Sequence, residues 1–353
     1  MTRGQCAIAR FSALLEGYQL THCFTPTFKQ LDGADTSQLD GGEATGISLA
    51  SFSEELLEAC DAIYVDYDDR LSDMTIYEQV IDIANHLNIQ VILSKEMNHA
   101  HHPAAILPLN EWDRSQQPEK DRSEKDRLEE IPVPVVMVLT EGHRTDQLAT
   151  ELALRKYFKD TAYKVSQIFS ELAAPLFDCE NIPLSMYAPG DAYGKALMFN
   201  KFAKDLVDAE RPELLIIGVP GAIGKYSNQQ LQGLGLLPQI ICSAVKSDAA
   251  VLCLYQAECN KDILDVFYHL TDYKFDSPAN VFSIANTHAQ PDESHFGERL
   301  QYIDVDSQFV LAHINNEVES GEYVLYSALN SGSAQQGGIG VQMALTDHVD
   351  SIG

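Results

Sequence analysis

Short apolar runs alternate along the chain with segments whose apolar residues recur at helical spacing. The most compact run is Val135–Leu139, which has the length and β-branched content of a buried parallel strand. A polar turn, Thr140–Asp146, follows it at once, and Leu148, Leu152 and Phe158 then recur at helical spacing. The pattern predicts a strand, a tight turn and a helix, the unit that holds phosphate at a helix N-terminus in nucleotide-binding proteins.

The same alternation continues on both sides of this unit. It predicts an α/β protein made of two Rossmann-like, three-layer domains with mostly parallel sheets. Expected strands lie at 6–11, 18–24, 62–65, 89–93, 135–139, 163–169, 213–220, 249–254, 281–285 and 300–305. Expected helices lie at 53–60, 76–87, 148–158, 195–209, 238–245, 262–268 and 307–315.

A charged and polar segment, 113–131, interrupts the alternation and marks the best domain boundary. We therefore expect a Rossmann-like domain over 1–112, a charged linker over 113–131 and a second domain over 132–315. The segment 316–353 contains the run Ser331–Gly340, which is rich in glycine and serine, and we expect this tail to be partly flexible.

The net charge of the chain limits the kinds of partner that the protein is expected to bind. The chain has 24 basic and 52 acidic residues and a formal net charge of −28, which disfavours nucleic acid and anionic membranes. Docking of a basic protein or peptide and a merely solvated acidic surface both remain open. Seven cysteines without a CxxC pair, no 18-residue apolar run and no signal peptide predict a cytoplasmic protein with reduced thiols.

The turn after the first strand of the second domain is the candidate nucleotide site. Its residues Thr140, Glu141, Gly142, His143, Arg144 and Thr145 would face a phosphate, and further candidates are Lys195 at a helix start and the pair Pro220-Gly221 after a buried strand. A working P-loop needs several backbone N–H groups, a lysine and a Ser or Thr hydroxyl. The turn has one glycine and no lysine. It therefore predicts a degenerate loop, and ATP or GTP is retained only as the alternative cofactor.

Two other clusters allow a metal reading beside a purely solvated one. Asp66, Asp68 and Asp69 follow a predicted strand, and His99, His101 and His102 lie in a polar segment before Pro103. Neither has a recognisable ligand spacing, so no metal site is assigned. No Ser-His-Asp or Cys-His set can be singled out, and catalytic residues remain unassigned.

The order of elements in 132–315 resembles that of P-loop NTPases, with Val135–Leu139 as the first strand and Leu214–Gly218 as the Walker B strand. The chain as a whole resembles the bacterial peptide maturation system proteins of gene clusters for ribosomally made peptides. The matching segments are Asp40-Gly41-Gly42, Thr45-Gly46, Ser53–Asp61, Gln147–Lys156, Tyr163–Gln167, Met198–Phe202 and Ile216–Gly221.

This resemblance implies an accessory component that binds a precursor peptide or a maturation enzyme on a degenerate nucleotide-binding scaffold. It leaves open whether the protein forms a homo-oligomer. The alternative is a nucleotide-dependent ligase, transferase or NTPase with a variant phosphate loop.

Overall fold

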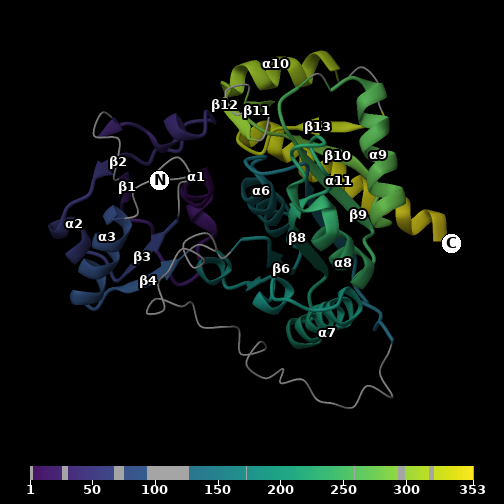
Figure 1. The fold of residues 1–353 in the computed structure, drawn as a ribbon, viewed down its shortest axis with the longest axis horizontal. Coiled ribbons are helices and arrows are strands. Elements are labelled where there is room, and N and C mark those ends of the chain that lie inside the picture. Colours follow the sequence, from purple (N-terminus) through teal and green to yellow (C-terminus); the bar gives the residue numbers. More distant parts are fainter. Residues whose placement is uncertain are drawn as a thin grey trace.

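The computed structural model describes residues 3–25, 31–66, 75–93, 127–171, 173–257, 259–292, 299–317 and 322–352. A seven-stranded parallel sheet forms the centre of the larger part of the molecule (Figure 1). Its strand order is β13-β10-β9-β5-β8-β6-β7, so β5 lies between β8 and β9. The strands are β5 (Val135–Thr140), β6 (Val165–Phe169), β7 (Glu180–Asn181), β8 (Leu214–Ala222), β9 (Ala249–Leu254), β10 (Ala279–Ile284) and β13 (Val324–Tyr326).

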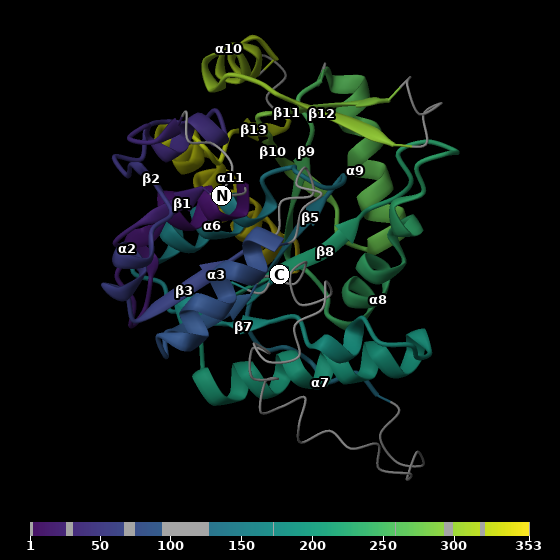
Figure 2. The same cartoon turned by 60° about the vertical axis from the view of Figure 1, so that its left-hand side comes forward.

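Helices cover both faces of this sheet (Figure 2). One face packs against α1 (Arg3–Arg10), α6 (Gln147–Asp160) and α11 (Ser331–Ile352). The other packs against α7 (Ala192–Glu210), α8 (Leu236–Ala244), α9 (Lys261–Phe275) and α10 (Ser307–Glu317). Along β5, Val136 and Val138 point to the first face and Val135, Met137 and Leu139 to the second. Both faces of the strand are therefore buried, which is why its sequence is continuously apolar.

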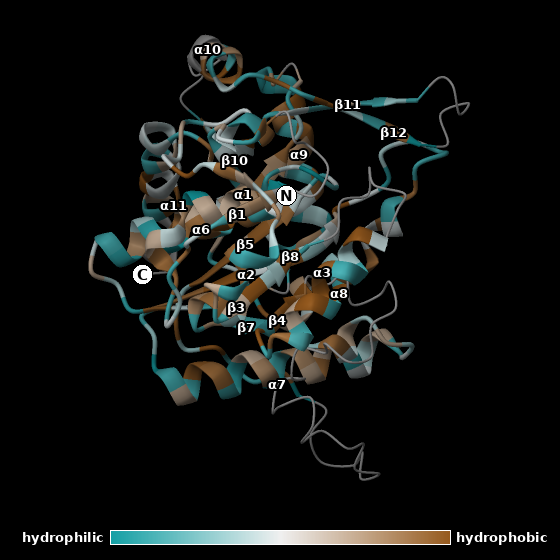
Figure 3. Ribbon diagram, turned by 90° about the vertical axis from the view of Figure 1, so that its left-hand side faces the viewer, coloured by the Kyte–Doolittle hydropathy of each residue, from teal (hydrophilic) through white to brown (hydrophobic). Residues whose placement is uncertain are grey.

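Hydropathy follows this layering (Figure 3), with the apolar strands β5 and β8 inside and a polar hairpin outside. The hairpin pairs β11 (Thr287–Pro291) with β12 (Leu300–Asp304) in antiparallel register. The chain crosses from β8 through α8 to β9, on the other side of β5. In open α/β sheets, ligands bind outside the carboxyl ends of the strands at such a switch point.

Two small parallel strand pairs make up the N-terminal part. β1 (Cys23–Thr25) pairs with β2 (Leu49–Ser51), and β3 (Ala62–Val65) pairs with β4 (Gln90–Leu93). The helices beside them are α2 (Glu54–Glu58) and α3 (Thr75–His86). As expected for a capped helix, the Ser53 hydroxyl accepts a hydrogen bond from the Leu56 N–H at the start of α2.

The predicted α/β class with mostly parallel sheets is confirmed, but the strand predicted over 6–11 is wrong. These residues belong to α1. Cys6 and Ala9 pack against the β1–β2 pair, whereas Ala7 and Ile8 pack against the core of the large sheet. Because the helix is buried on two sides, its apolar residues form an unbroken run, and such a short run does not distinguish helix from strand.

The expectation of a partly flexible tail is also wrong for most of its length. Val324–Tyr326 adds an edge strand to the large sheet, and Ser331–Ile352 forms α11, a helix of 22 residues. Its glycines permit close packing, since an added Cβ would overlap the ring of Tyr326 at Gly337, the ring of Tyr157 at Gly338 and the side chain of Val324 at Gly340. The Tyr157 hydroxyl also donates a hydrogen bond of 2.5 Å to Gln342.

These contacts predict that Gly338→Ala lowers the free energy of unfolding by about 1–3 kcal/mol, because the new methyl group must displace the Tyr157 ring. The matched control is Gly332→Ala in the same helix, where the nearest atom, Oδ1 of Asn330, lies 3.6 Å from the added carbon. This control is expected to change stability by no more than about 0.5 kcal/mol. Urea unfolding followed by circular dichroism measures both, and equal effects would contradict the packing role of Gly338.

The charged segment 113–126 lies outside the described residues, so the linker remains a prediction. Among the helices of the described ranges, none is both long and apolar enough to cross a membrane.

Candidate functional site

The turn between β5 and α6 contains the predicted phosphate loop. Eight residues, 140–147, run from the last residue of β5 to the first residue of α6. Aligned with the eight positions of a Walker A loop, this turn has Asp146 at the lysine position and Gln147 at the Ser/Thr position. The charge that would contact phosphate oxygens is therefore reversed.

Hydrogen bonds within the turn use groups that a phosphate would need. The Gly142 N–H donates to Thr140 Oγ1 (3.1 Å), and the Glu141 N–H donates to the Cys253 carbonyl of β9 (2.9 Å). The Thr140 and Thr145 hydroxyls hydrogen-bond to each other, and each also lies within hydrogen-bonding distance of the Gly142 carbonyl. The turn is closed by its own side chains.

The space above Gly142 is filled as well. An added Cβ there would overlap the Tyr255 hydroxyl and lie 2.7 Å from Gln232 Oε1. The Glu141 carboxylate accepts a hydrogen bond from the Tyr255 N–H at 3.0 Å. Burial raises the pKa of Glu141 to about 7, and this hydrogen bond opposes the rise. A carboxyl group and a phenol thus lie where a P-loop would hold phosphate.

At the start of α6, Asp146 forms a buried ion pair with Arg3 of α1. The guanidinium donates from Nε (2.8 Å) and Nη2 (2.7 Å) to the two carboxylate oxygens. The Asn286 N–H donates to the same carboxylate at 3.0 Å, and Asp304 of β12 accepts a further hydrogen bond from Nη1 of Arg3 at 2.8 Å. A P-loop protein binds phosphate at the N-terminus of this helix. In this protein the Arg3–Asp146 ion pair at that position instead connects α1 to α6 and the large sheet.

The side chain of Gln147 is also held by hydrogen bonds within the protein. Its amide donates to the carbonyls of Val138 in β5 (2.9 Å) and Val219 in β8 (2.8 Å). A Ser or Thr at this position of a working loop binds Mg²⁺. Here the side chain joins two strands instead.

The other predicted residues are two that belong to the turn, His143 and Arg144, and the pair Pro220-Gly221 in β8. His143 is exposed, and the Arg144 guanidinium lies over the Tyr302 ring, 5.2 Å from its centroid. Pro220 and Gly221 do adjoin the turn, since Thr140 pairs with Ala222. They lie inside β8 at a register shift, however, because the strand predicted to end at Pro220 continues to Ala222.

Lys195 belongs to a different environment. It lies in the first turn of α7, where its ammonium group donates to the Met186 carbonyl at 2.8 Å. The N-terminus of that helix is capped by Asp191, which accepts from the Gly194 N–H at 2.7 Å. Its hydrogen bond holds Lys195 to the segment before α7 rather than to the phosphate loop.

A second polar feature lies under the large sheet, on the α6 side. The Glu151 carboxyl lies against Gly218 of β8, where an added Cβ would overlap it, and accepts a hydrogen bond of 2.5 Å from the Ser170 hydroxyl. Burial raises the pKa of Glu151 to about 8, although the Ser170 hydrogen bonds oppose the rise. Glu151 is therefore predominantly neutral at pH 7.

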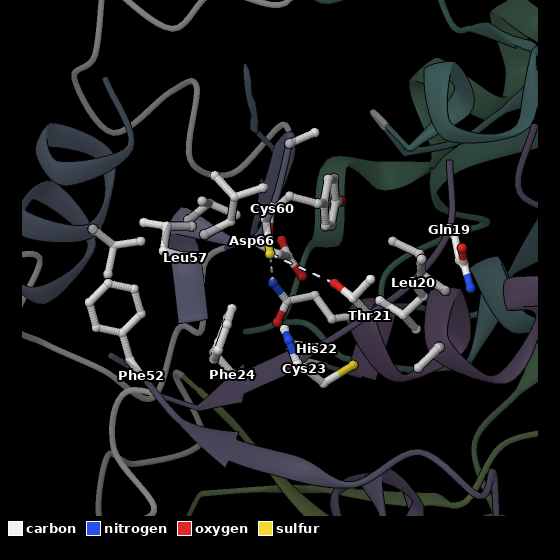
Figure 4. Close-up of a pocket in the computed structure, with 18 of the residues that line it drawn as sticks. Gln19, Leu20, Thr21, His22, Cys23, Phe24, Phe52, Leu57, Cys60 and Asp66 are labelled. Atoms are coloured by element: carbon white, nitrogen blue, oxygen red, sulfur yellow. Dashed lines mark hydrogen bonds between the residues drawn. The ribbon is translucent and has the colours of Figure 1, made fainter. Parts of the chain in front are cut away.

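A cavity of about 170 Å³ lies in the N-terminal part, between the β1 and β3 strands (Figure 4). Its walls are mostly apolar side chains from α1, β1, α2, β3 and α3. Asp66, the residue after β3, lines it and is only 8% exposed. The sequence placed Asp66 in a candidate ligand loop but gave no indication that it lines a cavity with mostly apolar side chains.

Comparison with solved structures finds a similar fold. A DUF1611 family protein from Anabaena variabilis superposes with a TM-score of 0.56 over 98% of this chain and 94% of that one, at 12% identity. The two folds match along nearly their whole lengths. No protein-family model matches the chain, and no curated protein does.

Two further structures superpose less closely. The signal recognition particle 54 kDa protein from Aeropyrum pernix, in complex with GDP, gives a TM-score of 0.32 at 14% identity, over 73% of this chain and 58% of that one. Chloroplast FtsY from Physcomitrella patens gives 0.27 at 13% identity, over 88% and 95% of the respective chains.

Metal ligands do not gather in the described part of the chain, where no group of three or more His, Cys, Asp or Glu could hold an ion. Asp68, Asp69, His99, His101 and His102 lie outside the described residues.

The sequence analysis did not assign three residues that shape this site, namely Asp146 and Gln147 of the loop and Arg3 of α1. Asp146 and Gln147 could have been found by counting the Walker spacing back from the helix start. No local signal points to Arg3, which reaches the loop from 143 positions away in the sequence.

Proposed function

We propose that the protein is a non-hydrolytic accessory component of a system that matures ribosomally synthesised peptides. It binds a precursor peptide or a partner maturation enzyme and uses a nucleotide-binding fold as a scaffold. The observation that carries the non-hydrolytic part is the occupied phosphate loop. Glu141, Tyr255 and the Arg3–Asp146 pair take the positions of phosphate and of its lysine.

Two surface properties support binding as the activity. The net charge of −28 favours association with basic partners through long-range attraction. The helix α9 also presents exposed apolar residues on one side, with Ile263 37%, Val266 66% and Tyr273 83% exposed. Their spacing of three and seven residues places them on one face of the helix. Exposed apolar side chains that adjoin one another are typical of protein–protein contacts.

Calorimetric titration of the full chain with Mg²⁺-ATP and Mg²⁺-GTP tests the non-hydrolytic part. We expect no binding at millimolar nucleotide, because Glu141, Tyr255 and the buried Arg3–Asp146 ion pair occupy the space and the hydrogen-bonding groups that a triphosphate would need. Submillimolar binding that is lost in Arg144→Ala would instead favour the competing hypothesis of a nucleotide-dependent enzyme.

The binding part is tested by titrating precursor peptide and maturation enzymes from the same gene cluster. We expect at least one to bind, and Val266→Glu to weaken an enzyme partner about tenfold or more, since a charge would be desolvated in the contact. Met343→Glu is the matched control, because Met343 is 61% exposed on the opposite side of the sheet, in α11. The absence of binding to every product of the cluster would overturn the proposal.

A further inference from the structure

The cavity between β1 and β3 has the features of a small-ligand site. Its volume of about 170 Å³ resembles that of protein cavities that hold one small organic molecule, such as benzene. The walls include Leu20, Phe24, Phe52 and Leu57, which Figure 4 shows around the space. Such walls favour binding of a ligand whose apolar part has roughly five to seven heavy atoms, because burial of this part removes apolar surface from water.

Asp66 supplies the carboxylate of the lining, whose other polar side chains include Gln5, Gln19, Thr21 and His22. Asp66 lies at the carboxyl end of β3, the edge at which ligands bind in open α/β structures. Cys60 lies before the other end of β3, where its sulfur is 3.7 Å from the Thr21 hydroxyl, and Figure 4 draws it with Asp66 among the lining residues. The lining formed by described residues contains no lysine or arginine. An ionised carboxylate accepts about four hydrogen bonds, so Asp66 can receive a ligand donor in addition to its contacts within the protein.

We propose that this cavity binds a small organic cation, an apolar chain or ring that ends in an amine or guanidinium nitrogen. The apolar body lies against Leu20, Phe24 and Phe52, and the cationic nitrogen donates to Asp66. A neutral ligand of the same shape gains the apolar contacts without a charge-assisted hydrogen bond, which is stronger than a neutral one. The strongly acidic chain also raises the local concentration of cations. This site is independent of the phosphate loop and of the proposed function.

Two sources can supply this chemistry, a free amine and the lysine side chain of a peptide. n-Butylamine reproduces the lysine side chain, and n-butanol is its neutral counterpart of the same length. The peptides Gly-Lys-Gly and Gly-norleucine-Gly form the second pair. Binding of n-butylamine alone identifies a free amine, and binding of both lysine-type compounds identifies a peptide side chain as a source.

The test titrates the full chain with these compounds by ligand-observed NMR. We expect n-butylamine to bind at least about tenfold more tightly than n-butanol, as the loss of one charged hydrogen bond implies. Asp66→Asn is expected to abolish this preference while the protein keeps its far-ultraviolet circular dichroism. Asp61→Asn removes the same charge from an exposed position five residues earlier and is expected to keep the preference within about twofold.

Equal affinity of the wild-type protein for n-butylamine and n-butanol would overturn the proposal, as would an unchanged preference in Asp66→Asn or no binding of either compound. The comparison between amine and alcohol needs no variant, so it remains decisive if Asp66→Asn does not fold. Failure of peptide maturation partners to bind would leave this result unaffected.

Discussion

Replacement of Arg3 by methionine is expected to lower the free energy of unfolding by about 3–5 kcal/mol. The side chain of Asp146 is 4% exposed and that of Arg3 is 10% exposed, so removal of the guanidinium leaves a buried carboxylate without its main counter-charge. The Asn286 N–H still donates to Asp146 but supplies no positive charge. Urea unfolding measured by circular dichroism gives the change.

Two further variants separate the ion pair from general loss of contacts. Arg3→Met combined with Asp146→Asn removes both charges and is expected to recover most of the loss. Asp304→Asn removes the charge of the other carboxylate that pairs with Arg3. Because the Asp304 side chain is 43% exposed, this change is expected to lower the free energy of unfolding by no more than about 1 kcal/mol. If the free energy of unfolding of Arg3→Met stays within about 1 kcal/mol of the wild-type value, the Arg3–Asp146 ion pair between α1 and α6 does not stabilise the fold as proposed.

Five of the seven strands of the large sheet, all except β7 and β13, could be predicted because their signals are local. Val135–Leu139 is apolar at every position since helices cover both faces of β5, and the helix that follows repeats its apolar residues every three or four positions. These features depend on neighbours within a few residues. The class of the fold followed from them.

The site could be predicted only in part, because its decisive contacts join distant segments. The single glycine and the absence of lysine in Thr140–Thr145 are visible in the sequence and predict a degenerate loop. The sequence did not indicate which groups contact the loop, because Tyr255 follows β9 and Arg3 belongs to α1, both far from the loop in the sequence. Lys195 lies at a helix start as predicted, in the first turn of α7, but its ammonium group donates to the Met186 carbonyl.

The glycine-rich tail shows how composition can mislead. The glycine-rich run Ser331–Gly340 predicts flexibility, because glycine lowers helix stability in isolation. In the structure Gly337, Gly338 and Gly340 let α11 approach Tyr326, Tyr157 and Val324 more closely than any larger residue would. Tertiary packing therefore outweighs intrinsic propensity here, and only the three-dimensional neighbours reveal it.

Stability of the wild-type protein is expected to fall as pH rises from about 5 to 8, and Glu151→Gln is expected to remove much of this decline. The pKa of Glu151 is raised from 4.5 to about 8 by burial in the folded state. Between these values the unfolded chain releases a proton that the folded chain keeps, so the free energy of unfolding drops by about 1.4 kcal/mol per pH unit. Below the lower value both states are protonated, and above the upper one both are ionised.

Glutamine has nearly the same shape as protonated glutamate and carries no charge at any pH. Glu151→Gln is therefore expected to match the wild type within about 1 kcal/mol at pH 5 and to exceed it by several kcal/mol at pH 8. Glu141→Gln is the informative comparison, since the pKa of Glu141 is raised only to about 7. Its advantage over the wild type should grow up to pH 7 and then level off, whereas that of Glu151→Gln should continue to grow to pH 8. Urea unfolding at intervals of half a pH unit distinguishes the two curves, and a Glu151→Gln curve parallel to that of the wild type would show that Glu151 ionises normally beneath the sheet.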